Sequence, residues 1–293
     1  MALVLQILEI IAPVFMLAFV GWSWVRTGHR YEIEFVTRLV MNISAPCLVF
    51  TALVKVEIDP TAFRDLALAA VSAYALVGVL IASICLIAGL SYRTYLAPLT
   101  FGNTGNMGLP LALYAFGELG LAYAVVVFAV MVLLSFTLGV WVVTGRSNPT
   151  EALRQPLFYA AILGSAIGLL DVPVPKVVIN AMSLAGQMMI PMMLITLGVS
   201  ISRLNVNHVW RASMLSVLKA GVCALAGFGA AHVFGLTDAA RGVLVLQLLT
   251  PVAVTSYLLA ERYNADAEAV SGLVVVSTLL TLAVVPAALS VLL

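Results

Sequence analysis

Two clusters of polar residues beside a proline interrupt otherwise apolar stretches of this sequence. The first is Asn103-Thr104-Gly105-Asn106-Met107-Gly108-Leu109-Pro110, and the second is Gln247-Leu248-Leu249-Thr250-Pro251. Proline removes a backbone donor and clashes with the preceding turn, so a helix broken at membrane depth exposes peptide groups that protein, solvent or a ligand must satisfy. Free amides at the N-termini of half-helices carry about half a positive charge, which suits the binding of an anion. The side chains predicted to contribute to such a site are Asn103, Thr104, Asn106, Gln247 and Thr250, with Pro110 and Pro251 at the breaks.

Residue patterns that would indicate an enzyme are missing from the sequence. It contains no His-Glu-x-x-His and no Gly-x-Ser-x-Gly, and its three cysteines lie in apolar runs without Cys-x-x-Cys spacing. Hydrolysis inside a membrane requires a positioned nucleophile with a base, paired carboxylates or a metal. No basic run with interleaved aromatic residues points to nucleic acid. We therefore predict that the protein is not an enzyme and that it uses no metal or other cofactor.

The composition identifies the medium in which the chain folds. Of the 293 residues, 63% are hydrophobic and 9% are charged, and the mean hydropathy is +1.15. This leaves too few polar side chains to cover a water-soluble globule, so the lipid bilayer is a predicted partner. Apolar runs long enough to cross about 30 Å of hydrocarbon predict ten spans in an all-α polytopic membrane protein. They cover 3–25, 35–54, 65–90, 94–116, 119–144, 156–171, 176–200, 209–234, 239–260 and 269–292.

The distribution of basic residues predicts how these spans are oriented. Nine arginines fall in the connections on one side, whereas Lys55, Arg64, Lys176 and Arg241 fall on the other. Because short cytoplasmic connections are enriched in Lys and Arg, both termini are predicted to be periplasmic or extracellular. The polar connection from Gly145 to Gln155 is then cytoplasmic and marks the boundary between the two halves of the chain.

Prolines recur at nearly constant spacing in the two halves. Pro13 and Pro156, Pro46 and Pro191, and Pro110 and Pro251 are separated by 143, 145 and 141 residues. The spacing predicts a first repeat over 1–144 and a second over 145–293. Five spans are an odd number, so the second repeat is inverted with respect to the first. Asn42 and Gln187 lie four residues before Pro46 and Pro191, and they either line the cavity opposite the broken helices or hold neighbouring helices together.

Lys219 lies inside the eighth span, eight residues after Arg211. A lysine at this depth usually faces a cavity or a partner, and it would then compensate the charge of a substrate or replace a coupling cation. The alternative is that its long side chain extends to the cytoplasmic surface.

The sequence around both breaks resembles the auxin efflux carrier family. The resemblance rests on the segment from Asn103 to Pro110, followed by Phe116-Gly117, and on Pro251 with Ala260-Glu261-Arg262-Tyr263-Asn264. It extends over essentially the whole chain and includes the segment from Asn42 to Phe50. The family contains plant PIN auxin carriers and bacterial permeases associated with malate or malonate. This chain lacks the long central loop of the plant carriers, which favours a bacterial member in the inner membrane.

The resemblance implies a fold shared with bile acid symporters and with sodium/proton antiporters of the NhaA kind. In that fold, spans four and nine are broken and cross each other. Spans one, two, six and seven would form a scaffold, and spans three to five and eight to ten would form a transport body. The resemblance also implies that Asn103, seven residues before Pro110, contacts the substrate, and that the protein forms a homodimer through its scaffold.

These observations together predict a secondary active or facilitative transporter of small organic anions that works by an elevator type of alternating access. The substrate is a dicarboxylate such as malate or malonate, or an auxin-like indole acid. A channel, or a carrier for a solute that is not an anion, is the alternative function. Capping of the broken helices is the alternative role for Asn103 and Asn106, and bridging between helices is the alternative for Gln247 and Thr250.

Overall fold

The structure is a computed structural model that describes residues 2–55, 59–139, 141–142, 156–170, 172–204, 209–236 and 238–293. The regular elements in these ranges are helices. Counting consecutive helical elements as one where they are continuous, seven helical segments are long and apolar enough to cross a membrane. Two shorter apolar helices cover Pro156–Gly168 and Ala239–Leu249. The prediction of an all-α polytopic membrane protein is therefore confirmed at this level. The predicted boundary between the two halves, at 145–155, lies outside the described residues.

The helices of the first half follow the predicted apolar runs within a few residues. They are α1 (Ala2–Arg26), α2 (Ile33–Leu39), α3 (Ala45–Lys55), α4 (Pro60–Ile87), α5 (Tyr92–Thr100) and α6 (Leu109–Leu134). Short π-helical segments at Val40–Ser44, Thr104–Gly108 and Ser135–Gly139 join or extend them. Within α6, Gly117 has φ 67° and ψ −157°, a left-handed conformation that glycine adopts without a Cβ clash. This kink lies where the sequence predicts that the fourth span ends and the fifth begins.

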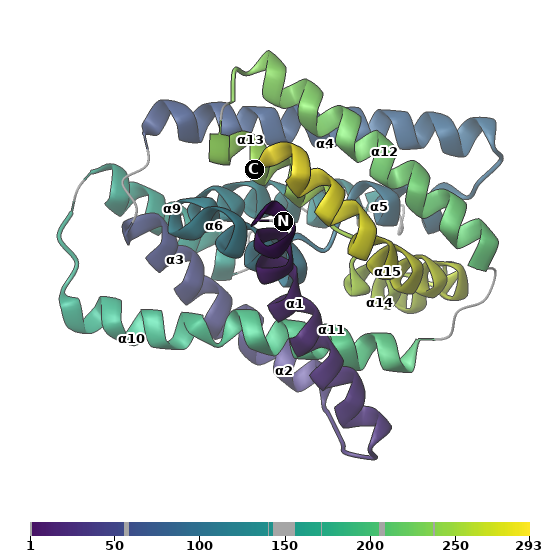
Figure 1. Cartoon of the computed structure of the whole chain (residues 1–293), viewed down its shortest axis with the longest axis horizontal. Coiled ribbons are helices and arrows are strands. Elements are labelled where there is room, and N and C mark those ends of the chain that lie inside the picture. Colours follow the sequence, from purple (N-terminus) through teal and green to yellow (C-terminus); the bar gives the residue numbers. More distant parts are fainter. Residues whose placement is uncertain are drawn as a thin grey trace.

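The second half contains α9 (Pro156–Leu169), α10 (Lys176–Gln187), α11 (Met189–Arg203), α12 (Val209–Val233), α13 (Asp238–Leu249), α14 (Val254–Arg262) and α15 (Ala267–Leu292). The helices α10 and α11 follow each other along one edge of the molecule, and α4 and α12 lie side by side along the opposite edge (Figure 1).

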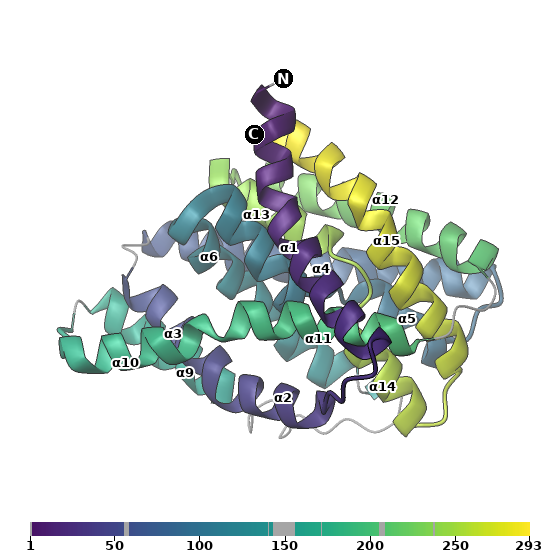
Figure 2. The ribbon, with the colours of Figure 1, turned by 60° about the horizontal axis from the view of Figure 1, so that its bottom comes forward.

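Two groups of helices pack more closely within themselves than with each other. In the first group, α1 packs on α11, and α3 packs on α9 and α10. In the second, α12 packs on α4, α13 and α15, while α13 also packs on α6. Figure 2 shows α1 crossing the front of the molecule, with α11 beside it. The apolar interiors of both groups belong to one continuous core.

The contact between α10 and α3 depends on the small size of Gly186. A Cβ at this position would lie 2.8 Å from the amide nitrogen of Leu48 and 2.9 Å from its Cα. Backbone atoms yield less than the end of a flexible side chain, so we expect Gly186→Ala to cost about 1–2 kcal/mol by overpacking. The melting temperature of the detergent-purified protein should fall by about 3–6 °C.

Gly221→Ala is the matched control for this change. A Cβ at Gly221 in α12 meets nothing within 4 Å, so the melting temperature should stay constant or rise slightly because alanine favours the helix. Equal melting temperatures for the two variants would contradict the close contact between α10 and α3.

Candidate functional site

The two interrupted helices meet where their backbones become extended. The first interruption separates α5 from the π-helical segment Thr104–Gly108, and the second separates α13 from α14. Gly102 and Val252 form an antiparallel bridge, and the Asn103 N–H donates a hydrogen bond of 2.7 Å to the Pro251 carbonyl oxygen. Peptide groups left without helical partners are therefore satisfied in part by each other, as a membrane interior requires.

Pro251 and two glycines lie where the two backbones approach. Pro251 accepts the bond from Asn103. Pro110, predicted at the first break, lies instead in the first turn of α6, where a missing backbone N–H is tolerated. A Cβ on Gly102 would lie 2.2 Å from Thr250 Oγ1, and a Cβ on Gly108 would lie 2.0 Å from Gln247 Oε1. Both glycines are needed because side chains of the second interruption occupy the space beside them.

The N-terminal ends of the two half-helices have no side-chain cap. Asn103 occupies the N-cap position before Thr104–Gly108, and Ala253 occupies the N-cap position of α14, and neither accepts a capping hydrogen bond. The amide nitrogen Nδ2 of Asn103 and the hydroxyl of Thr104 are buried and have no hydrogen-bond partner among the described residues. Unpaired buried polar groups are costly, so this arrangement is typical of donors held ready for a ligand.

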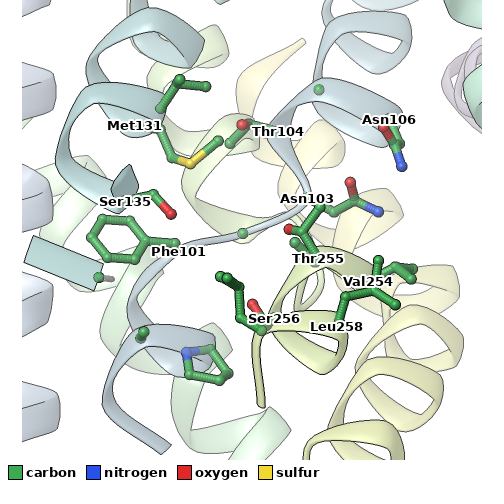
Figure 3. A pocket seen from close by; sticks show the side chains of 18 of the residues that line it. Phe101, Asn103, Thr104, Asn106, Met131, Ser135, Val254, Thr255, Ser256 and Leu258 are labelled. Atoms are coloured by element: carbon green, nitrogen blue, oxygen red, sulfur yellow. The ribbon is translucent and has the colours of Figure 1, made fainter. Parts of the chain in front are cut away.

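Both residues belong to the lining of a cavity of about 280 Å³. Asn103, Thr104 and Asn106 line it from one interruption, and Thr255 and Ser256 in the first turn of α14 line it from the other. Figure 3 shows Asn103 next to Thr255, with Phe101, Met131 and Ser135 on a neighbouring wall. Sequence reasoning did not find Thr255, Ser256 or Ser135, although Thr255 and Ser256 lie only four and five residues after the predicted Pro251.

Most of the remaining cavity wall is apolar. It consists of methionine, phenylalanine and aliphatic side chains from five separate parts of the chain. They include Ile33, Met41, Phe101, Phe128, Met131, Val132, Phe136, Met189, Met193, Val254, Leu258 and Leu259. Methionine adapts its shape readily and is common at surfaces that accept varied apolar ligands. The cavity thus combines a polar end at the crossing with an apolar body.

Arg93 supplies a positive charge among the described residues that line this cavity. It lies in the first turn of α5, and its guanidinium donates a hydrogen bond of 3.0 Å to the carbonyl oxygen of Tyr263, just after α14. The sequence assigned Arg93 only to a basic connection between spans. Arg93 lies only ten residues before Asn103, and this short separation was the feature of the sequence that could have placed it near the same site.

The other predicted residues at the second interruption lie outside the lining of the large cavity. Gln247 is fully buried, and its Nε2 donates to the carbonyl oxygen of Ala124 at 3.3 Å, which links α13 to α6. The hydroxyl of Thr250 donates to the carbonyl oxygen of Gln247 at 2.6 Å. The Gln247 contact links two helices, as the bridging alternative predicts, whereas the Thr250 hydroxyl bonds within its own helix end. Oε1 of Gln247 is buried without a partner among the described residues.

The two residues one turn before the paired prolines are not brought together. Asn42 is exposed, and its Nδ2 donates to the carbonyl oxygen of Arg38 at 2.8 Å. Gln187 lines a second cavity of about 250 Å³ together with Lys55, Glu118 and Pro191.

Lys219 is 3% exposed, so its side chain does not extend to a surface. Its ammonium donates to the carbonyl oxygens of Thr250 at 2.7 Å and of Leu248 at 3.3 Å. These carbonyls belong to the C-terminal end of α13, which carries about half a negative charge. The interpretation in which Lys219 reaches the cytoplasmic surface is therefore wrong for this structure.

Comparisons with known proteins agree with a transporter. Over 306 aligned residues the chain is 26% identical to an uncharacterized transporter of Methanothermobacter thermautotrophicus, covering 95% of this chain and 96% of that protein. Over 198 residues it is 23% identical to an uncharacterized transporter of Methanocaldococcus jannaschii, covering 63% of each protein. Residues 6–152 and 140–289 match the family described as membrane transport protein. The chain therefore belongs to the membrane transport protein family, which is the auxin efflux carrier-like family indicated by the residues around its two helix breaks.

Proposed function

We propose that this membrane transporter carries small organic anions and holds them where its two interrupted helices cross. The observation that carries the proposal is the pair of buried, unpartnered donors, Asn103 Nδ2 and Thr104 Oγ1, beside the uncapped N-terminus of α14. A carboxylate at this point would accept hydrogen bonds from side chains and would face the positive ends of two half-helices. Arg93 adds a positive charge along the cavity wall.

The cavity favours an amphipathic monocarboxylate over a dicarboxylate. Its volume of about 280 Å³ is near the lower end of small-molecule sites, which span roughly 300–1,000 Å³. The unpartnered donors gather at the crossing, while most of the remaining wall is built of methionine, phenylalanine and aliphatic side chains. Its polar members are Arg93, Thr37, Thr94, Ser135, Thr196 and Ser200. Over the apolar part of that wall, a second carboxylate would lose its hydration without gaining partners, which is costly. An aromatic ring at the same place would gain about 25 cal/mol for each Å² buried.

Ten spans arranged as inverted repeats over 1–144 and 145–293 form part of the proposal. Support comes from the positions of the helices along the chain and from the interruption at a corresponding place in each half. We assign spans one, two, six and seven to a scaffold and the others to a transport body, in keeping with the two groups of closely packed helices. Two further points remain predictions. Both termini lie on the periplasmic or extracellular side of a bacterial inner membrane, and the protein forms a homodimer through the scaffold.

Alternating access of the elevator type is supported by where the cavities lie. The cavity of about 280 Å³ is lined by Thr37 and Met193 of the proposed scaffold and by Asn103 of the body. The second cavity is lined by Lys55 of the scaffold and Glu118 of the body. Both therefore lie along the boundary across which the body would move.

Counterflow in proteoliposomes tests the proposed substrate class. We expect saturable uptake of a labelled indole acid, accelerated by the same acid on the opposite side. Malonate and malate should compete with half-saturation concentrations at least about tenfold higher, which corresponds to about 1.4 kcal/mol.

Each alternative has its own result in this assay. Preference for malonate or malate would establish a dicarboxylate carrier, and transport of a neutral analogue alone would exclude the anion site. Flux without saturation or acceleration by substrate on the opposite side would indicate a channel.

A further inference from the structure

The ammonium of Lys219 binds backbone carbonyl oxygens at the C-terminal end of α13, and several hydroxyl oxygens lie nearby. Besides its bonds to Thr250 and Leu248, the ammonium lies 3.8 Å from Sγ of Cys223, one turn further along α12. The Lys219 side chain is buried between α12 and the second helix interruption. The positive charge of Lys219 is thus held next to Thr250, one residue before Pro251, where the two interrupted helices cross.

A small cavity of about 10 Å³ adjoins Lys219, which is close to the volume that one water-sized group occupies. Hydroxyl groups line it from three elements: Ser216 in α12, Thr250 at the interruption, and Ser277 and Thr281 in α15. Ser216 is 2% exposed, and its hydroxyl has no hydrogen-bond partner among the described residues. The Ser216 hydroxyl, which has no hydrogen-bond partner among the described residues, therefore lines the same small cavity as Lys219, whose ammonium binds two carbonyl oxygens.

We propose that these oxygens form a site for a monovalent alkali cation, which the ammonium of Lys219 occupies as a built-in substitute. Hard cations take carbonyl and hydroxyl oxygens as ligands, and secondary transporters bind Na⁺ at unwound carbonyls and at the C-terminal ends of half-helices. Loss of the ammonium then exposes a sodium site formed by the carbonyls of Leu248 and Thr250 with the hydroxyl of Ser216. The Ser277 hydroxyl, which accepts the Val252 N–H at 2.9 Å, has a second lone pair for the same cation. The cation site itself does not depend on the proposed carrier function; only its effect on transport rests on that function.

The simpler reading of Lys219 is a cation that stabilises the C-terminal end of a helix, as basic residues commonly do. The two readings differ in what happens when the ammonium is removed. If Lys219 is only a helix-end charge, its removal lowers the melting temperature by the same amount in every salt. If it occupies a cation site, sodium specifically restores the melting temperature of the variant.

Melting temperatures of the full-length protein in detergent test the site without any substrate. Lys219→Ala is compared with the unmodified chain in 150 mM sodium, potassium or choline chloride. We expect sodium to raise the melting temperature of Lys219→Ala by about 3–5 °C over choline, because a ligand that binds the folded state stabilises it by mass action. The unmodified chain and Lys55→Ala, which removes an exposed lysine, should not distinguish the three salts.

A second substitution connects the sodium effect to the hydroxyl groups. Adding Ser216→Ala to Lys219→Ala should reduce the sodium-specific rise by at least half, because one oxygen ligand is lost. Lys219→Gln retains most of the side-chain volume and offers an amide oxygen to the same cavity, so it should also respond to sodium if Lys219→Ala does not fold. In proteoliposomes, transport by the sodium-responsive variant should become dependent on sodium.

Specific results overturn the proposal. Folded Lys219→Ala and Lys219→Gln variants with the same melting temperatures in sodium and choline would show that no cation site exists. An equal rise in the unmodified chain would show that sodium binds elsewhere. A sodium-specific rise together with no organic-acid transport by the unmodified chain would sustain the cation site and reject only the proposed substrate.

Discussion

Replacing Asn103 by alanine is expected to raise the half-saturation concentration for the organic anion by about 10- to 100-fold, with the fold intact. A hydrogen bond to a charged group contributes about 1.5–3 kcal/mol, and each 1.4 kcal/mol is a factor of ten. The Nδ2 atom makes no hydrogen bond within the described structure, so its loss leaves no partner unsatisfied. The bond from the Asn103 backbone to Pro251 does not depend on the side chain and is retained.

Asn42→Ala is the matched control, because it removes an asparagine that is exposed and bonded only to its own helix in the described contacts. Counterflow with this variant should stay within about twofold of the unmodified protein, since surface substitutions rarely exceed ±0.5 kcal/mol. Asn103→Asp provides a stronger test, because its carboxylate would repel an anionic substrate. Unchanged half-saturation in Asn103→Ala would remove this residue from the site.

Gly102→Ala is expected to destabilise the protein and stop transport together. The added Cβ would lie 2.2 Å from Thr250 Oγ1 and 3.0 Å from the Thr250 carbonyl oxygen. Overpacking of this kind costs up to about 3 kcal/mol, which corresponds to a fall in melting temperature of about 6–12 °C. The two extended segments would have to move apart, and Asn103 would be displaced from the cavity with them.

Two further variants separate this effect from a general intolerance of substitution. Gly78→Ala in α4 places its Cβ 3.9 Å from the nearest atom, Thr100 Cγ2, and should leave stability and transport nearly unchanged. Thr250→Ala removes the hydroxyl that Gly102→Ala would contact, so the double variant should be more stable than Gly102→Ala alone by about 1 kcal/mol. A fully additive double variant would show that the two segments do not meet as described.

The helix interruptions could be predicted from sequence, and the family resemblance implied that they cross, but the register of their pairing could not be predicted. Proline and glycine beside polar residues mark a break through local backbone chemistry, and both breaks occur where such residues lie. The register that places Gly102 opposite Val252 depends on how distant helices pack. Nothing within either segment specifies that register, so it remained outside the prediction.

The candidate site was predicted in part for a similar reason. Asn103, Thr104 and Asn106 were found because they are adjacent in the chain, whereas the apolar wall comes from methionines and phenylalanines spread over distant segments. In a membrane protein such residues are common everywhere, so their types alone do not mark a cavity. Lys219 was recognised as unusual, but its partners are backbone carbonyls, which have no signature in the sequence.

The hydrogen bond between Asn103 and Pro251 also has a consequence for biogenesis. Its donor is synthesised roughly half a chain length before its acceptor. During insertion, the first interruption therefore enters the bilayer with a peptide N–H that has no partner, at a cost of several kcal/mol. The early helices must tolerate this state, shielded by water or by the insertion machinery, until α13 and the segment that follows it arrive. The site thus forms only after the second interruption has been synthesised and inserted.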